Sequence, residues 1–192
     1  MHITFAPRGI LQIDDARITH QNFSGAPSKF NREGDRNFSL KIEDRDLTMD
    51  EVKNIEEIYR AASILVDDDG RPVLDYDGLQ IITVVDILKA LGWNVKVKPP
   101  RNEDEEPFIY MPVKIKFNDR GPAVYLKSGN SVNQLNEDTI GILDDVEIDR
   151  LDMDIRPYDW EVNGKTGRTA YLQGLDVVQK VDRFAERYRD NF

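Results

Sequence analysis

Two short segments in the middle of the chain alternate strictly between apolar and polar residues. In 109–117 every second side chain is apolar, and 123–127 repeats the pattern with Val124 and Leu126. Successive side chains of a β-strand point to opposite faces, so both segments are predicted to be strands with one buried face. The intervening residues 118–122 have the composition of a turn, and we expect the two strands to form a hairpin.

The exposed face of this predicted hairpin combines tyrosine with lysine. Its members are Tyr110, Lys114, Lys116, Tyr125 and Lys127. Aromatic rings stack on unpaired bases and cations contact phosphates, and single-stranded nucleic acid binding requires both. The alternative is an ordinary solvated strand face, in which the tyrosines are present for their β propensity.

The composition is that of one domain with an appendage. The chain has 192 residues, of which 40% are hydrophobic and 32% charged, enough for one core. We expect one domain over 1–180, with a helical insertion around 46–92, and a charged C-terminal tail over 181–192. Cysteine is absent, no apolar run approaches membrane-spanning length, and the N-terminus does not resemble a signal peptide. These features predict a cytoplasmic protein without a membrane partner.

The net charge of −10 is the main objection to a nucleic-acid ligand. Phosphate binding depends on Lys and Arg, which release counterions from the nucleic acid. The two signs are segregated, however: acidic residues gather in 44–57, 67–77, 103–106 and 137–154, and basic residues gather on predicted strands and turns. Because the field at a site depends on nearby charges, a local positive groove is physically reasonable in an acidic protein.

The remaining segments predict a mainly β protein with inserted helices. Strands are expected over 10–22, with a bulge at Asp14-Asp15, and over 35–43 and 93–98. Thr48 and Glu51 have the spacing of a capping box for a helix over 48–64, and a second helix is expected over 79–91. Asn136 is predicted to cap a short helix over 137–144.

Two long strands are predicted in the last part of the domain. The first covers 146–162, with a slip in its alternation near Asp149, and the second covers 168–178. The Asn163-Gly164 pair between them is a strong hairpin signal. Long, bulged antiparallel strands with a helix inserted between pairs indicate an α+β class and an OB-fold-like Greek-key barrel.

The first long strand carries a second candidate stacking surface. If the alternation continues through its end, Arg156, Tyr158 and Trp160 face outward together. In the alternative, Pro157 shifts the alternation and Trp160 enters the core. Lys165, in the following turn, is placed to contact phosphate, although turn chemistry alone also explains Gly164 to Gly167, and the spacing of a Walker loop is missing.

Further basic residues lie in a loop and on a short strand. The loop over 29–38 contributes Lys29, Phe30, Arg32 and Arg36, and the strand over 93–98 contributes Lys96 and Lys98. Loops of this kind flank the ligand groove of OB folds. The alternative for the loop is internal ion pairing, since Glu33 and Asp35 lie among its arginines.

Evidence for an enzyme is absent from the sequence. Four carboxylates, Glu147, Asp149, Asp152 and Asp154, crowd one predicted strand, as in a two-metal nuclease. The slip in alternation divides them into two pairs, which favours a solvated acidic face. Only two histidines are present, near the N-terminus, so no catalytic triad can be argued and no cofactor or metal is predicted.

Three segments together resemble a family of small bacteriophage and prophage proteins. They are 29–38, with the sequence KFNREGDRNF; 92–96, with GWNVK; and 156–167, with RPYDWEVNGKTG, followed by Ala170-Tyr171-Leu172. The resemblance covers about residues 10–180 and is to OB-fold single-stranded DNA-binding proteins encoded beside phage replication and recombination genes. It implies a non-enzymatic protein that coats single-stranded DNA in a bacterial host cell, without sequence preference.

The resemblance also draws attention to the end of the chain. Phage single-stranded DNA-binding proteins often end in an acidic tail with an aromatic tip that docks replication or recombination proteins. Phe192 matches this pattern, whereas Arg187 and Arg189 dilute the acidity. Two other functions stay open, an acidic DNA mimic that inhibits a host enzyme and a carboxylate-metal nuclease, and the oligomeric state, a homo-oligomer included, is not determined.

Overall fold

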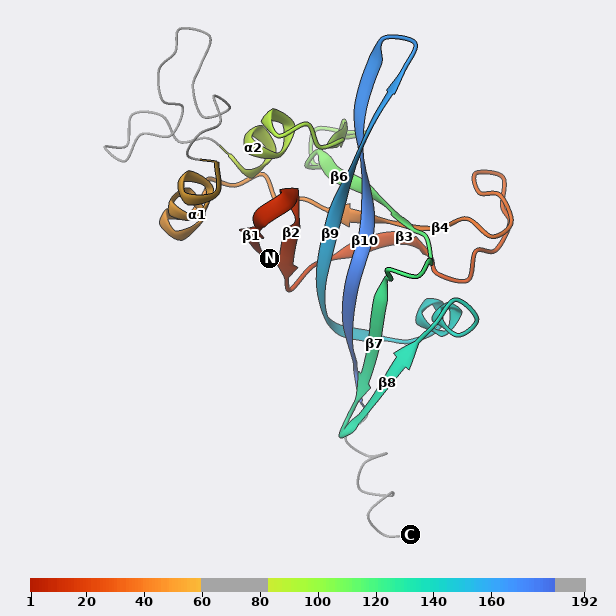
Figure 1. Ribbon diagram of the computed structural model, residues 1–192. Helices are drawn as coiled ribbons and strands as arrows, with labels where there is room; N and C mark the ends of the chain where they lie inside the picture. The colour runs from red at the N-terminus through yellow and green to blue at the C-terminus, as the bar shows by residue number, and fades with distance from the viewer. Residues whose placement is uncertain (60–82, 182–192) are drawn as a thin grey trace, which may run out of the picture.

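The computed structural model describes residues 1–59 and 83–181, and a twisted β-sheet makes up most of them (Figure 1). The α-helices of these described residues are α1 (Met49–Tyr59) and α2 (Val84–Ala90). The strands are β1 (His2–Phe5), β2 (Leu11–Asp14), β3 (Ile18–Asn22), β4 (Arg36–Lys41), β5 (Lys96–Lys98), β6 (Phe108–Ile115), β7 (Ala123–Ser128), β8 (Ser131–Leu135), β9 (Ile148–Val162) and β10 (Lys165–Gln179). The protein is therefore mainly β with inserted helices, as predicted.

Strands β9 and β10 form a long hairpin around which the sheet is organised (Figure 1). The hydrogen-bonded order is β1-β2-β9-β10-β6-β4-β3, with β5 paired to β6 and β8 paired to β7. Beyond the sheet, the hairpin projects from the body of the molecule and ends at Asn163 and Gly164. Both turn residues have positive φ, 51° and 76°, as the Asn-Gly signal predicts.

The predicted hairpin between the two alternating central segments is wrong. Instead, β6 and β7 both run parallel to β10 and follow one another along it, with β6 opposite Ala170 and Tyr171 and β7 opposite 174–178. The antiparallel partner of β7 is β8, which is not among the strands expected from the sequence. Alternation reports which face of a strand is buried but not which strand lies beside it, and here the turn at 116–122 carries the chain onward along β10.

The burial predicted from alternation is confirmed. Met111, Val113 and Ile115 of β6 are buried, as are Val124 and Leu126 of β7. The slip near Asp149 is also confirmed, because Ile148 pairs with Gln179 and Arg150 with Val178, which leaves Asp149 as the extra residue of a bulge.

The first predicted strand is divided rather than bulged. Asp15 has φ 52°, a conformation that ends β2, and the chain resumes as β3 at Ile18. The two halves then take different partners: β2 pairs with β9 and β3 pairs with β4. One segment of chain thus supplies strands near both ends of the hydrogen-bonded strand order.

The capping box of α1 is as predicted, whereas the short helix after β8 is capped at a different residue. The N–H of Glu51 donates to Thr48 Oγ1 at 3.2 Å, and the N–H of Thr48 donates to Glu51 Oε1 at 2.9 Å, so the capping box of α1 is complete. Asn136 Oδ1 accepts from the N–H groups of Asp138 and Thr139 in the turn that precedes the short 3₁₀ helix Ile140–Asp144. That helix begins later than the predicted residue 137, and its N-cap is Thr139, which makes no side-chain capping hydrogen bond. The predicted continuation of α1 to Ile64 and the middle of the insertion lie outside the described residues.

Helix α2 begins later than predicted. Its capping residue is Thr83, whose side chain accepts from the N–H of Asp86 at 3.2 Å, and the chain leaves the helix at Gly92 with φ 91°. No helix within 1–59 or 83–181 is long and apolar enough to cross a membrane.

Candidate nucleic-acid interface

Four aromatic side chains lie on the outward surface of neighbouring strands. Strand alternation turns Phe108 and Tyr110 outward on β6, and the pairing of Tyr171 with Lys114 and with Arg156 carries the same face onto β10 and β9. We call this surface the aromatic face, and its members are Phe108, Tyr110, Tyr158 and Tyr171 with the cations Lys41, Lys114 and Arg156.

The rings of the aromatic face form two groups. Phe108 and Tyr110 are stacked, with ring centroids 5.2 Å apart and an angle of 20° between the planes. Tyr158 and Tyr171 meet edge to face at 5.9 Å. Lys114, which is exposed, lies between the two groups, because it shares β6 with Tyr110 and pairs with Tyr171.

The cations of the aromatic face are placed against rings rather than carboxylates. Lys41 Nζ is 6.0 Å from the centroid of the Phe108 ring, and the Arg156 guanidinium is 4.8 Å from that of Tyr171. Within the described residues, none of Lys41, Lys114 and Arg156 forms an ion pair with a carboxylate. Their charge is therefore available to a bound anion.

Strand β5 extends this positive charge. Lys96 lies opposite Tyr110 and Lys98 opposite Phe108, and both lysines are exposed. Directly opposed residues of paired strands share a face. The two predicted binding lysines thus flank one end of the aromatic face.

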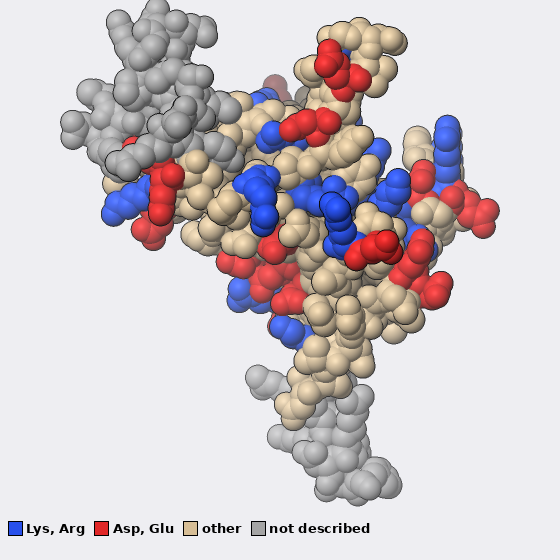
Figure 2. Space-filling model, in the orientation of Figure 1, with Lys and Arg blue, Asp and Glu red and all other residues tan. Residues whose placement is uncertain are grey.

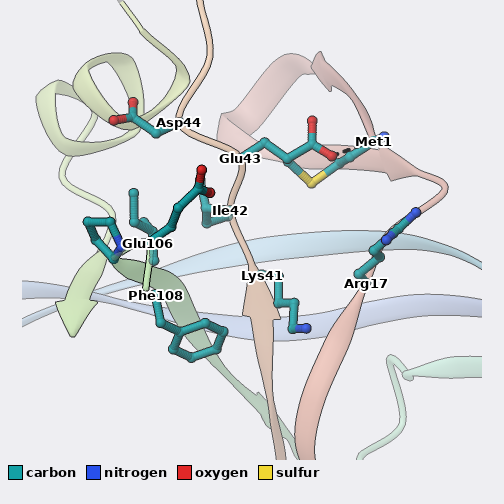
Figure 3. Close-up of a pocket in the computed structure, with 10 residues that line it drawn as sticks. Met1, Arg17, Lys41, Ile42, Glu43, Asp44, Glu106 and Phe108 are labelled. Carbon is teal, nitrogen blue, oxygen red and sulfur yellow. Dashed lines mark ion pairs between the residues drawn. The ribbon is translucent and has the colours of Figure 1, made fainter. Parts of the chain in front are cut away.

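A pocket lies at the same end (Figure 3). It has a volume of about 660 Å³, and Arg17, Lys41, Phe108, Glu43 and Glu106 contribute to its wall. A second pocket, of about 290 Å³, shares Lys41, Phe108 and Glu106 and includes Lys98. The surface around the Phe108 ring is thus hollowed on more than one side.

The outward orientation of Arg156, Tyr158 and Trp160 is confirmed. Tyr158 is 54% exposed and Trp160 is 38% exposed, so Trp160 is not a core residue. Trp160 pairs with Gly167, and its ring lies over that glycine, where any β-carbon would overlap it. Lys165 is exposed near the tip of the hairpin.

The opposite side of the β9–β10 hairpin is fastened to the body of the protein. Arg168 donates to both carboxylate oxygens of Asp159, at 2.7 and 3.1 Å, and its guanidinium lies 5.2 Å from the ring centroid of the buried Trp93. The hydrogen bond from Arg168 lowers the pKa of Asp159. This contact limits the orientations available to Tyr158 and Trp160 on the hairpin.

The loop before β4 is held by side-chain amides. Asn31 Nδ2 donates to the carbonyl groups of Ala26, Arg32 and Asp35, at 3.2, 2.9 and 2.8 Å. At the tip, Phe30 is 91% exposed, with Lys29 Nζ 5.8 Å from its ring centroid. Arg32 is also exposed, so three predicted binding residues project from a well-organised loop.

Arg36 is used differently from the prediction. Its guanidinium forms an ion pair with Glu137 at 3.4 Å and donates to the Glu137 carbonyl at 3.2 Å. Arg36 lies opposite the buried Ile115, so strand alternation places its side chain on the opposite side from Lys114. Lys116, just after β6, is exposed and lines a pocket of about 380 Å³ with Arg36 and Tyr171.

Tyr125 and Lys127 are separated from Tyr110 because β6 and β7 do not form a hairpin. Tyr125 pairs with Asp176, and Lys127 Nζ forms an ion pair with the same carboxylate at 3.3 Å. Asp152 lies opposite Asp176 across the β9–β10 ladder. These two predicted binding residues therefore lie among carboxylates, away from the aromatic face.

The carboxylates over 147–154 do not gather into a metal site in the described structure. Asp152 binds Arg150 at 3.1 Å, and Glu147 binds Lys180 at 3.0 Å. Burial, followed by the charges of Asp14 and Asp176, raises the pKa of Asp154. Within the described ranges, no group of three or more His, Asp or Glu could hold a metal ion.

Sequence reasoning missed three members of the aromatic face: Lys41, Phe108 and Tyr171. The signals were available, because Lys41 alternates with the inward residues Leu40 and Ile42, and Phe108 lies two residues before Tyr110. The predicted docking tail at 181–192 lies outside the described residues from position 182 onward.

Comparison with known proteins identifies one family. The family model described as "Putative phage ssDNA-binding domain" matches residues 3–60 and 80–191. Among curated proteins, no relative matches the chain.

The solved structures similar to this chain include the single-stranded DNA-binding protein from bacteriophage Enc34. That protein is 12% identical, with a TM-score of 0.44 over 96% of this chain and 93% of that one. Its complex with ssDNA is 13% identical, with a TM-score of 0.46 over 92% and 89% of the two chains. The match to the family model, which spans most of the chain, is the one that assigns its family.

Proposed function

The chain belongs to the phage single-stranded DNA-binding domain family, and we propose that it binds unpaired DNA along its aromatic face without sequence preference. The observation that carries the proposal is the combination, on one outward surface, of two ring groups and three cations without carboxylate partners among the described residues. Every base has a π-face, so rings bind bases of any identity, and the cations bind the phosphates between them.

The stacked pair and the edge-to-face pair would bind different bases of one DNA strand. Phe108 and Tyr110 would receive bases at the β5–β6 end, and Tyr158 and Tyr171 would receive bases at the β9–β10 end. Lys114, between them, would contact the phosphates that connect the two groups. The pocket of Figure 3 adjoins this path beyond Phe108, and its wall combines Lys41 and Arg17 with the carboxylates Glu43, Asp44 and Glu106.

Two projections border the proposed path. The tip of the 23–35 loop presents Phe30 and Lys29, and the β9–β10 hairpin presents Trp160 and Lys165. Figure 2 shows Lys and Arg side chains in a band over the middle of the molecule, interspersed with Asp and Glu. A DNA strand that lies between the 23–35 loop and the β9–β10 hairpin would contact an aromatic ring and a cation on each of these two projections.

We further propose that the sheet is an OB fold. Strands β2 and β3 belong to one stretch of chain, and the hydrogen-bonded path through β9, β10, β6 and β4 leads from one half of that stretch to the other. The amide of Ala16, between the halves, also donates to the Leu151 carbonyl of β9 at 2.8 Å. Such a five-strand circuit with two projecting loops is the arrangement that OB folds use for oligonucleotides.

The role that this binding supports is coating, without catalysis, of DNA strands displaced in phage replication or recombination. The test is a titration of fluorescent oligo-dT, followed by competition with unlabelled single strand and with duplex of equal length. Stacking needs unpaired bases, so the single strand is expected to compete much more strongly than the duplex. Equal competition by the duplex, or no binding of oligo-dT, would overturn the proposal.

A further inference from the structure

Four of the described strands, β1, β3, β5 and β8, are paired with a neighbouring strand on one side and have a free edge on the other. Three of these four carry a feature that discourages a further strand from pairing with the free edge. Exposed strand edges attract other chains, and proteins protect them by covering, charging or distorting them. The protection of each edge can therefore be compared.

The edge of β1 is covered by helix α1. Asn54 Oδ1 accepts from the N–H of Phe5 at 2.7 Å, and Asn54 Nδ2 donates to the Phe5 carbonyl at 3.0 Å. The edge of β5 carries the exposed lysines Lys96 and Lys98. The edge of β3 is distorted, with His20 at φ 52° and an interrupted register against β4.

Among the described residues, none covers, charges or distorts the free edge of strand β8. The stretch 128–136 contains no charged residue, and Val132 in its middle is 59% exposed. Alternate residues of an antiparallel strand direct their backbone N–H and C=O groups away from their partner. Within the described part of the chain, the backbone of 131–135 makes no hydrogen bond to any segment outside the β7–β8 hairpin. Figure 2 shows few Lys, Arg, Asp or Glu side chains over the lower end of the described residues, where Figure 1 places the β7–β8 hairpin.

We propose that β8 pairs with β8 of a second copy of this chain, antiparallel, and joins two sheets edge to edge. Two copies with a net charge of −10 each repel one another, so a neutral surface is where they meet at least cost. Self-pairing of β5 would set lysine against lysine, whereas self-pairing of β8 about Asn133 sets Val132 against Gln134. This contact is two-fold and closed, so it predicts a dimer rather than a filament.

The position of β8 suits two copies on one DNA strand. It joins β10 through β7 at 174–178, whereas the aromatic face meets β10 at Tyr171 and the hairpin tip lies beyond. Pairing through β8 therefore leaves both aromatic faces open. This consequence depends on the proposed function, but the dimer itself does not.

The experiment is sedimentation velocity of the full chain without DNA, over a concentration series. The wild type is expected to shift from monomer to dimer as concentration rises. Val132→Lys with Gln134→Lys, which sets four lysines against one another, is expected to remain monomeric. The control, Val132→Thr with Gln134→Thr, keeps the edge neutral and is expected to retain the dimer.

A wild type that stays monomeric at every concentration, or a lysine variant that dimerises like the wild type, overturns the proposal. Hydrogen exchange of the wild type gives a second readout that does not depend on the folding of any variant: amides of 131–135 are expected to exchange more slowly at high concentration. Exchange that is independent of concentration also overturns it. A short oligo-dT that occupies one copy separates the two proposals, because the lysine variant is expected to bind it at least as well as the wild type does.

Discussion

Tyr171 is the side chain on which the proposed binding surface depends most. Its ring contacts the Arg156 guanidinium at 4.8 Å and the Tyr158 ring at 5.9 Å, and it lies opposite Lys114. Tyr171→Leu removes one stacking ring, a loss of about 1–3 kcal/mol per base. Because Arg156 and Tyr158 also lose their neighbour, we expect the upper part of that range, a decrease in oligo-dT affinity of about thirty- to hundred-fold.

The same substitution is expected to cost the fold much less. Tyr171 is only half-buried, and leucine retains part of its apolar contact. An aromatic pair contributes about 0.5–1.5 kcal/mol and an exposed cation–π contact about 0.5–1 kcal/mol, so about 1–2 kcal/mol of folding free energy would be lost. For a domain of this size, that lowers Tm by several degrees.

The assay pairs fluorescence anisotropy of labelled oligo-dT with thermal melting followed by circular dichroism. Tyr125→Leu is the matched control, since Tyr125 is also a half-buried outward tyrosine of the sheet but pairs with Asp176. It is expected to bind oligo-dT like the wild type. A folded Tyr171→Leu variant with unchanged affinity, or an equal loss in Tyr125→Leu, would show that the aromatic face is not the binding surface.

Three further outcomes are expected. Gly167→Ala should displace the Trp160 ring and red-shift the tryptophan emission, with little change in Tm; unchanged emission contradicts the packing of Trp160 on Gly167. Glu51→Gln should destabilise the protein by about 1–3 kcal/mol in urea unfolding at neutral pH, a discounted value because Arg45 is partly exposed. Burial alone would raise the pKa of Glu51, but hydrogen bonds from Arg45 and Thr48 outweigh the effect of burial and lower the pKa. The stability that ionised Glu51 contributes is therefore present at neutral pH and is lost as pH falls through the folded-state pKa. A stability difference between Glu51→Gln and the wild type that persists in acid contradicts this reasoning. Lys114→Gln should reduce the salt dependence of log affinity for oligo-dT by about 0.7, and an unchanged slope excludes a phosphate contact there.

The orientation of side chains was predictable from the sequence because a strand has a fixed period of two. That period turned Tyr158 and Trp160 outward and buried Val113 and Leu126, and the structure agrees at each position. The capping box of α1 was predictable for a similar reason, because its hydrogen bonds join residues only three positions apart.

The partners of each strand were not predictable in the same way. Strand β7 pairs with 174–178, about fifty residues later, and no local pattern distinguishes that arrangement from a hairpin with β6. The error placed Tyr125 and Lys127 beside Tyr110, whereas in the structure they lie beside Asp176. Arg36 shows the same limit, because its partner Glu137 lies 101 residues away. Charge and exposure at a binding site depend on such distant pairs, and residue type alone does not report them.

The arrangement of carboxylates explains how an acidic protein can offer a surface to DNA. Asp159, Asp176 and Glu137 are each paired with a cation, and Asp154 lies on the part of the sheet that β7 borders. The cations of the aromatic face, like the neighbouring Lys96 and Lys98, form no ion pair with a carboxylate among the described residues. The local potential there is more positive than the net charge suggests, but long-range attraction of DNA is weak. Affinity must then depend mainly on stacked rings, which salt screens far less than it screens phosphate contacts.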